Sequence, residues 1–160
     1  MEHFIELYTD GAASGNPGQG GFGVVLKFKH HRKEMSAGFK LTTNNRMELL
    51  AVIVGLESVT NNDLPVKIYS DSKYVVDSIN LKWVFGWRKT GFKNKANVDL
   101  WKRFLNIYDA QKHHFFWVKG HASNAENNRC DELAVMASKR PNLPRDEGYD
   151  AIKRGGSLED

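Results

Sequence analysis

The stretch VKIYSDS, Val66–Ser72, decides the fold class, because it places a short apolar strand after a helix-forming segment. In that upstream segment, apolar side chains recur at the spacing of an amphipathic helix, at Met47, Leu50, Ala51 and Val54. Strand-like runs precede the helix, and a strand that returns after a helix implies a crossover connection. The sequence therefore predicts an α/β domain built on a mixed sheet.

The rest of the chain extends this pattern in both directions. Residues 4–9 alternate apolar and polar side chains, and the runs FGVVLKFK and KEMSAGFKL flank a polar link at residues 30–32, which predicts three strands in a meander. After Ser72, the runs SKYVVDSI, VDLWKRFLNIYDA and AENNRCDELAVMASK predict helices, and HHFFWVKGH predicts a strand. We expect one catalytic domain over residues 1–140. Apolar content falls from Pro141, so residues 141–160 are expected to form a partly disordered tail.

Composition narrows the class of protein. A chain of 160 residues suits one compact domain, and a single cysteine, Cys130, excludes an internal disulfide and a structural zinc cluster. The sequence has no apolar run long enough to span a membrane and no basic, apolar leader at its N-terminus, so a cytoplasmic protein is expected. The net charge is +4, and seven basic residues against one acid gather between Lys82 and Arg103. This concentration indicates a polyanionic partner.

Four carboxylates stand out, and each also has a local explanation. Asp10 precedes a glycine and is typical of a turn. Glu48 lies three residues after Asn45, the spacing of a capping box. Asp71 is in place to cap the next helix, and Asp131 to favour the positive end of the last one. For a carboxylate considered alone, the local explanation is usually favoured over a functional role.

The positions of two carboxylates favour a shared site. Asp10 and Asp71 both follow strands, and the carboxyl ends of strands form the edge of an open α/β sheet where sites occur. A carboxylate cluster without a basic partner suits Mg²⁺ or Mn²⁺, which prefer oxygen ligands. Two such cations activate a water and stabilise the leaving oxygen of a phosphodiester.

Five motifs together resemble type 1 ribonuclease H over residues 4–140: YTDGAASGNPG, TTNNRMELLA, IYSDSKYV, NVDLWKR and WVKGHASNAENNRCDELA. The resemblance implies a five-stranded mixed sheet of order 3-2-1-4-5, with strand 2 antiparallel and helices on both faces. It also implies an endonuclease, acting as a monomer, that hydrolyses the RNA strand of RNA·DNA hybrids with two Mg²⁺ ions, or Mn²⁺, and leaves 3′-hydroxyl and 5′-phosphate ends. Its cellular role would be the removal of RNA primers and R-loops.

The resemblance also assigns residues position by position. The metal-binding carboxylates of the family fall on Asp10, Glu48, Asp71 and Asp131, and its mobile histidine falls on His121. Contacts to RNA 2′-hydroxyls fall on Gly11 and Glu48, and contacts to base edges in the minor groove fall on Asn16, Asn44 and Asn45. Contacts to the DNA strand fall on a phosphate pocket near Thr43, on Trp83, and on a basic handle at Trp87, Arg88, Lys89 and Lys93.

The handle departs from the bacterial members of that family. It is shorter between Lys93 and Val98, and Gly86 stands where those enzymes carry a polar residue that helps to hold a DNA phosphate. Weaker hybrid binding with intact chemistry is therefore expected. Trp83 and Trp87 are also four residues apart, a spacing that favours simple packing on one helix face.

The sequence bears on three rival interpretations. GQGGFG, residues 18–23, matches a dinucleotide-binding fingerprint but continues into a strand and not into a helix. A proofreading exonuclease would need D-x-E in the first strand, where this chain has Asp10, Gly11 and Ala12. A non-catalytic hybrid-binding module of the same fold remains as the alternative, although such a module has no use for a repulsive carboxylate cluster.

Overall fold

A five-stranded mixed sheet forms the centre of the protein. The computed structural model describes residues 3–60, 63–119 and 124–155. The strands are β1 (Ile5–Ser14), β2 (Gly18–Phe28), β3 (His31–Thr42), β4 (Val66–Ser70) and β5 (His113–Trp117). Their order is β3-β2-β1-β4-β5, with β2 antiparallel to β1 and β3, and with β4 parallel to β1 and β5. The strand order implied by the resemblance is confirmed.

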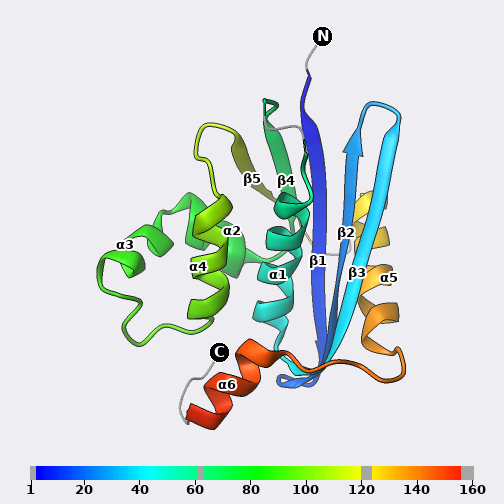
Figure 1. The fold of residues 1–160 in the computed structure, drawn as a ribbon. Coiled ribbons are helices and arrows are strands. Elements are labelled where there is room, and N and C mark those ends of the chain that lie inside the picture. The colour runs from blue at the N-terminus through cyan, green and yellow to red at the C-terminus, as the bar shows by residue number, and fades with distance from the viewer. Residues whose placement is uncertain (1–2, 61–62, 120–123, 156–160) are drawn as a thin grey trace.

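Helices cover both faces of the sheet. They are α1 (Asn44–Glu57), α2 (Lys73–Asn80), α3 (Trp83–Lys89), α4 (Val98–Ile107), α5 (Ala125–Ser138) and α6 (Glu147–Gly155). Figure 1 shows α1 in front of the sheet with α4 beside it, and α5 behind β2 and β3. The layered α/β architecture predicted from the strand that follows a helix is therefore confirmed.

α1 is buried on almost every side, which differs from the amphipathic helix expected. Leu49, Val52 and Ile53 are fully buried together with the predicted core positions, whereas Val54 is only partly buried. The reason is that α1 packs between the sheet and α4, whose Trp101 and Phe104 belong to the same core. A helix that is apolar all round is typical of such an enclosed position.

The chain after residue 140 differs from the expected tail. α6 forms there, Leu143 and Tyr149 are buried, and the Asp146 carboxylate accepts hydrogen bonds from the buried Arg46 guanidinium, one of them at 2.8 Å from Nε. The partner that orders this segment lies a hundred residues away in the sequence, so local composition gave no sign of it. The domain boundary at residue 140 stays a prediction.

The described chain has no helix with both the length and the apolar character needed to cross a membrane.

Candidate active site

Two neighbouring strands bring Asp10 and Asp71 together. β1 and β4 pair in parallel, and the last paired residues are Tyr8 and Tyr69, two positions before the aspartates. β1 itself does not end at residue 9 as expected, because its pairing with β2 continues to Ser14. Asp10 therefore lies inside β1, just beyond the point where β4 leaves it, and is 8% exposed. The expected parallel pairing of the two strands is confirmed, and Asp71 directly follows β4, but Asp10 does not lie at the carboxyl end of its strand.

Glu48 reaches the same point from α1. The first turns of α1 lie directly against β1, since a Cβ atom on Gly11 would overlap the Glu48 nitrogen and the Met47 carbonyl carbon. Gly11 is thus needed for helix packing, in addition to any contact with substrate. The resulting cluster is tight: ligand oxygens of Asp10, Glu48 and Asp71 all lie within 4.8 Å of one another.

The structure rules out the turn and capping explanations for these acids. Asp10 is a strand residue opposite Gly23 and not part of a turn. α1 is capped by Thr43, whose hydroxyl accepts from the Arg46 amide at 3.2 Å, so the capping box at Asn45 and Glu48 is wrong. The remaining helix caps are also supplied by other residues, α2 by Ser72 and α5 by Asn124, which leaves Asp71 outside a cap and Asp131 in mid-helix.

Burial and mutual repulsion raise the pKa values of two members of the cluster. Burial raises the pKa of Asp10 to about 8, and the Asp71 charge adds to this rise, although the Gly11 amide donates to Asp10 Oδ1 at 2.8 Å and opposes it. Burial likewise raises the pKa of Glu48 well above its ordinary value, with further contributions from the charges of Asp10 and Asp71. The cluster therefore resists full ionisation unless a cation compensates it.

The donor set fits a hard divalent cation. Among the described residues, Glu48 Oε1 and Asp71 Oδ1 are buried oxygens without a hydrogen-bond donor. Buried acceptors are normally paired, so two orphaned oxygens in one carboxylate cluster point to a ligand that supplies positive charge. Carboxylate oxygens with no thiolate or imidazole among them suit Mg²⁺ or Mn²⁺.

Asp131 approaches the cluster from α5 on the other side of the sheet. Its charge contributes to the raised pKa of Asp10, but its carboxylate is exposed and lies outside the tight group of three. The Cys130 carbonyl lies so close to Gly23, the strand partner of Asp10, that a Cβ on that glycine would overlap it. Cys130 itself is buried, and burial raises the pKa of its thiol, as expected for a packed side chain. His121 lies outside the described residues.

Protein stability in the absence of metal is expected to depend on the proton held by Asp10. Its folded pKa of about 8 exceeds the ordinary 3.8, so the folded protein retains a proton that the unfolded chain releases. This contribution is complete below pH 3.8 and is lost as the pH rises to about 8. In EDTA, the free energy of unfolding of the wild type should therefore fall across this window relative to that of Asp10→Asn. Urea denaturation at several pH values measures the difference, and parallel profiles for the two proteins would contradict it.

The residues assigned to RNA contact connect β1, the following turn and α1. The Asn44 amide donates to Asn16 Oδ1 at 3.1 Å, and the Ala13 amide donates to Asn44 Oδ1 at 2.7 Å. Asn45 lies in the first turn of α1. The turn and cap chemistry expected for these asparagines is therefore present at Asn16 and Asn44, and both remain exposed beside the carboxylates. Thr43 is buried as the helix cap.

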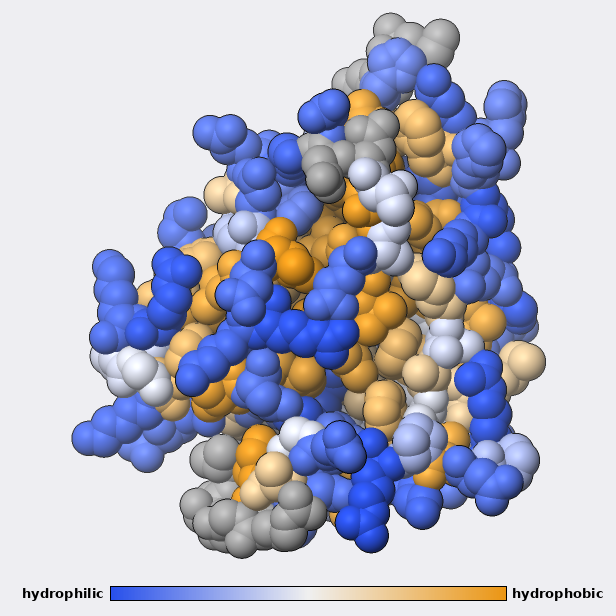
Figure 2. All heavy atoms as spheres, viewed as in Figure 1, coloured by the Kyte–Doolittle hydropathy of each residue, from blue (hydrophilic) through white to orange (hydrophobic). Residues whose placement is uncertain are grey.

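The basic handle presents one exposed tryptophan. Trp83 is 48% exposed on α3, whereas Trp87 packs edge-on against the core residue Trp101, with ring centroids 5.9 Å apart. Lys95 lies over the Trp87 ring at 5.2 Å. The packing interpretation thus holds for Trp87, and Trp83 remains available to a ligand. The handle cations Arg88, Lys89 and Lys93 are also exposed, and Figure 2 shows mostly hydrophilic side chains projecting from this side of the molecule.

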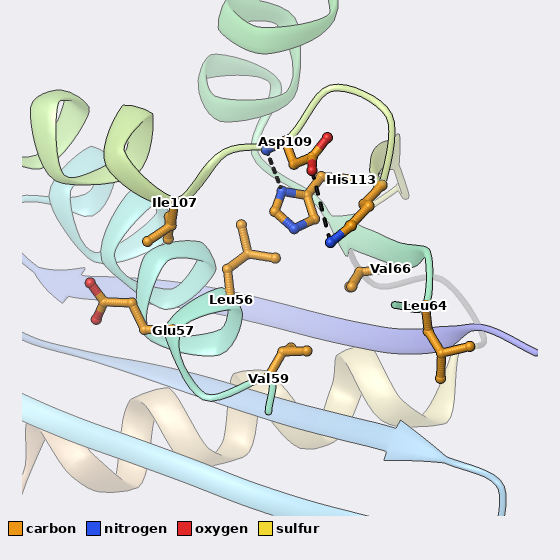
Figure 3. A pocket seen from close by; sticks show the side chains of 9 residues that line it. Leu56, Glu57, Val59, Leu64, Val66, Ile107, Asp109 and His113 are labelled. Atoms are coloured by element: carbon orange, nitrogen blue, oxygen red, sulfur yellow. Dashed lines mark hydrogen bonds and ion pairs between the residues drawn. The ribbon is translucent and has the colours of Figure 1, made fainter. Parts of the chain in front are cut away.

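Two hollows on the protein lie away from the carboxylate cluster. One of about 340 Å³ is lined by Leu56, Val66 and His113 among others, at the opposite ends of the parallel strands (Figure 3). Another of about 500 Å³ lies between the end of α3 and α4, beside Arg88 and Lys102. The carboxylates line neither of these two hollows.

Two residues near the cluster were not singled out from the sequence. Trp117 donates from Nε1 to the Asp71 carbonyl at 3.0 Å and so fixes the backbone that carries this carboxylate. Asn127 precedes Asp131 by one helical turn, and its Oδ1 is the third buried oxygen without a donor in the described chain. The four-residue spacing of Asn127 from Asp131 was visible in the sequence. The contact made by Trp117, in contrast, depends on tertiary structure.

Comparison with known proteins agrees with this site. The family model RNase H matches residues 2–139. The chain is 56% identical over 147 residues to the ribonuclease H of Desulforamulus reducens, which covers 89% of this chain and 92% of that protein. It is 52% identical over 151 residues to the ribonuclease H of Rippkaea orientalis, with 91% and 92% covered.

Two solved structures are also similar. LC9-RNase H1, described as a type 1 RNase H with the type 2 active-site motif, has a TM-score of 0.75 at 27% identity, with 95% of this chain and 81% of that chain covered. LC11-RNase H1 in complex with RNA/DNA hybrid has a TM-score of 0.62 at 28% identity, with 83% and 95% covered. These matches confirm the resemblance seen in the sequence, and the chain belongs to the ribonuclease H family.

Proposed function

We propose that this ribonuclease H is a metal-dependent endonuclease that hydrolyses the RNA strand of RNA·DNA hybrids and leaves 3′-hydroxyl and 5′-phosphate ends. The observation that carries the proposal is the cluster of Asp10, Glu48 and Asp71, with two buried oxygens that lack donors. Asp10, Glu48, Asp71 and Asp131 would hold two divalent cations, Mg²⁺ or Mn²⁺, whose chemistry when bound is activation of a water and stabilisation of the leaving oxygen. Removal of RNA primers and R-loops is the role consistent with that product.

The protein's own side chains would orient the hybrid and move protons. The exposed Asn16 in the β1–β2 turn and Asn44 at the start of α1 are already hydrogen-bonded to each other and would face the minor groove from a fixed position. Selection of RNA would depend on its 2′-hydroxyl, contacted near Gly11 and Glu48. His121 would move a proton or assist release of the product phosphate. Trp83 and the handle cations would bind the DNA strand. A hybrid as the substrate is supported by the RNA/DNA hybrid bound to the similar LC11-RNase H1.

The test is a labelled RNA·DNA hybrid incubated with the full chain in Mg²⁺ and in EDTA. We expect cleavage of the RNA strand in Mg²⁺ only, and none of the DNA strand or of an RNA duplex. A protein that binds the hybrid but never cuts it would instead be the non-catalytic module of the same fold. A binding module gains nothing from three mutually repelling carboxylates, which favours the enzyme. The cytoplasmic location and the monomeric state remain predictions.

Gly86 offers a test of the handle. It is exposed in α3, and a Cβ there would meet no atom within 4 Å. Gly86→Ala should raise the free energy of unfolding by about 0.5 to 1 kcal/mol, because glycine is unfavourable inside a helix. Gly86→Lys should in addition lower KM for the hybrid. The salt dependence of hybrid binding should also become steeper, by the amount expected for about one additional phosphate contact. Gly86→Ala is the matched control, and equal KM values for the two variants would show that residue 86 does not face the DNA.

A further inference from the structure

A row of stacked aromatic rings crosses three strands beside the carboxylates. Tyr8, Tyr69 and Phe116 are register partners on β1, β4 and β5. The rings of Tyr8 and Tyr69 stack with centroids 4.9 Å apart, and those of Tyr69 and Phe116 stack at 5.5 Å. These three residues are called the aromatic row below.

The row runs from the core to the solvent. Tyr8 is 8% exposed and packs with Cys130 and Leu133 of α5, whereas Phe116 at the other end is 42% exposed. Tyr69 lies between them and is partly buried. α5 therefore covers the Tyr8 end of this sheet face and leaves the Phe116 end accessible. An exposed phenylalanine stacked at the end of a ring ladder offers a flat surface for one more ring.

The row lies one step along the strands from the candidate active site. Residues two apart on a strand point to the same face, so Tyr8 and Tyr69 share a face with Asp10 and Asp71. The step between them is about 7 Å along the strand, comparable to the spacing of successive phosphates in an extended nucleic acid chain. A strand leaving the carboxylates in this direction would meet the rings within one or two nucleotides.

A basic side chain, Lys67, lies beside the row, and two nearby acids, Glu6 and Glu126, are paired. Lys67 and His114 are register partners in the next position along the same face. Of the acids, Glu6 accepts a hydrogen bond from the Tyr8 hydroxyl at 3.0 Å, and Glu126 pairs with Lys27 and Arg32. Rings beside basic side chains are the surface that single strands use, through base stacking and phosphate neutralisation.

We propose that the aromatic row binds single-stranded nucleic acid that continues from the hybrid, with bases stacked on Phe116 and Tyr69. The inference rests on the proposed function, which gives the position of the hybrid. The stacking of bases on the rings does not depend on that function. The exposed large apolar side chains here are Phe116, at the end of the row, and its chain neighbour Trp117, at 42% and 43% exposure, with Lys67 in the next position along the strands. This shape suits flat bases better than the broad apolar centre of a protein interface.

The test compares a blunt hybrid with hybrids extended at either end by a single strand of about six nucleotides. Dissociation constants are measured by fluorescence anisotropy with the full chain in EDTA at low salt, so that nothing is cleaved. The wild type should bind at least one extended hybrid more tightly than the blunt one. Phe116→Ala should reduce this advantage by at least about fivefold, the loss of one stacked base, and Phe116→Trp should retain it.

Met136→Ala is the matched control, because Met136 is an apolar side chain, 58% exposed, on the α5 surface outside the row. It should keep the advantage of the extended hybrid. No advantage in the wild type, or an equal loss for blunt and extended hybrids in Phe116→Ala, would overturn the proposal. If Phe116→Ala changed only the self-association of the protein, this face would be a protein contact surface, and the proposal would likewise be overturned. If only the proposed function were wrong, the protein would not cleave the hybrid in Mg²⁺, but it would still bind an isolated oligodeoxythymidine in a way that depends on Phe116. The two failures are therefore distinguishable.

Discussion

Asp10→Asn is expected to abolish cleavage of the hybrid without unfolding the protein. Asp10 supplies one of three carboxylates whose oxygens lie within 4.8 Å of one another, and its side chain is almost fully buried. The amide has nearly the same shape but carries no charge and offers one oxygen in place of two. Loss of groups that only support metal ligands typically lowers activity by about 10- to 100-fold, so loss of a ligand should exceed about a hundredfold. The measurement is kcat on a labelled hybrid in Mg²⁺.

The same substitution should leave the metal-free protein as stable as the wild type, or more stable. Burial and the Asp71 charge disfavour ionised Asp10, as its pKa of about 8 indicates. Removing that charge relieves the repulsion within the cluster. In EDTA at pH above 8, the Tm of Asp10→Asn should therefore exceed that of the wild type, and each kcal/mol gained corresponds to about 2 to 4 °C.

Asp77→Asn provides the matched control for both measurements. Asp77 is also an aspartate beyond β4, but it lies within α2 and outside the carboxylate cluster. It should leave cleavage and the metal-free Tm close to the wild-type values. Cleavage that survived in Asp10→Asn would remove the enzyme assignment, whereas a clearly lower Tm in EDTA would show that Asp10 is a structural residue.

The pairing of Asp10 with Asp71 was accessible from the sequence. Asp10 follows an alternating run and Asp71 a short apolar one, and the helix between them indicates a crossover, which the parallel pairing of β1 and β4 bears out. Parallel neighbours bring their carboxyl ends to one edge, which is where the structure brings the two carboxylates together. These inferences needed only the periodicity of apolar residues and the order of the segments along the chain.

Features that depend on distant contacts were not accessible in this way. The glycine after Asp10 suggested a turn, whereas β1 continues because β2 keeps pairing with it and because α1 packs against Gly11. α3 contains Gly86 and many cations, so no apolar period marked it as a helix. The four-residue spacing of Trp83 and Trp87 favoured packing for both, but only Trp87 reaches the core residue Trp101, whereas Trp83 stays exposed.

α6 is the clearest example of a distant contact, and its anchor leads to the second large prediction. Arg46 is 1% exposed and donates to two carboxylates from separate segments. Its terminal nitrogens donate to Asp99 at 2.9 and 2.8 Å, and Nε and Nη2 donate to Asp146 at 2.8 and 3.0 Å. The Thr42 hydroxyl donates to the same Asp146 carboxylate at 2.6 Å. One guanidinium therefore joins the starts of α1 and α4 to the segment before α6.

Arg46→Met is expected to lower the free energy of unfolding by about 3 to 5 kcal/mol, because it leaves the buried Asp146 charge without its cation. For a chain of this size, the Tm should fall by roughly 6 to 20 °C. Urea denaturation measures the loss directly. The matched control is Arg103→Met, since Arg103 pairs with Glu57 through a similar two-point contact but both side chains are exposed. That exposed pair should contribute no more than about 1 kcal/mol.

The pH dependence of the two variants separates this ion cluster from simple loss of packing. Burial of Asp99 would raise its pKa, but the Arg46 hydrogen bonds and charge outweigh burial and hold it below the ordinary 3.8. A carboxylate whose pKa is lower in the folded protein than in the unfolded chain stabilises the folded state at pH values above the unfolded pKa. This stabilisation is lost as the pH falls through the folded pKa. The difference in stability between wild type and Arg46→Met should therefore shrink below pH 3.8. A loss in Arg46→Met no greater than that in Arg103→Met, or one that stayed constant down to acid pH, would show that Arg46 acts through its volume and not through its charge.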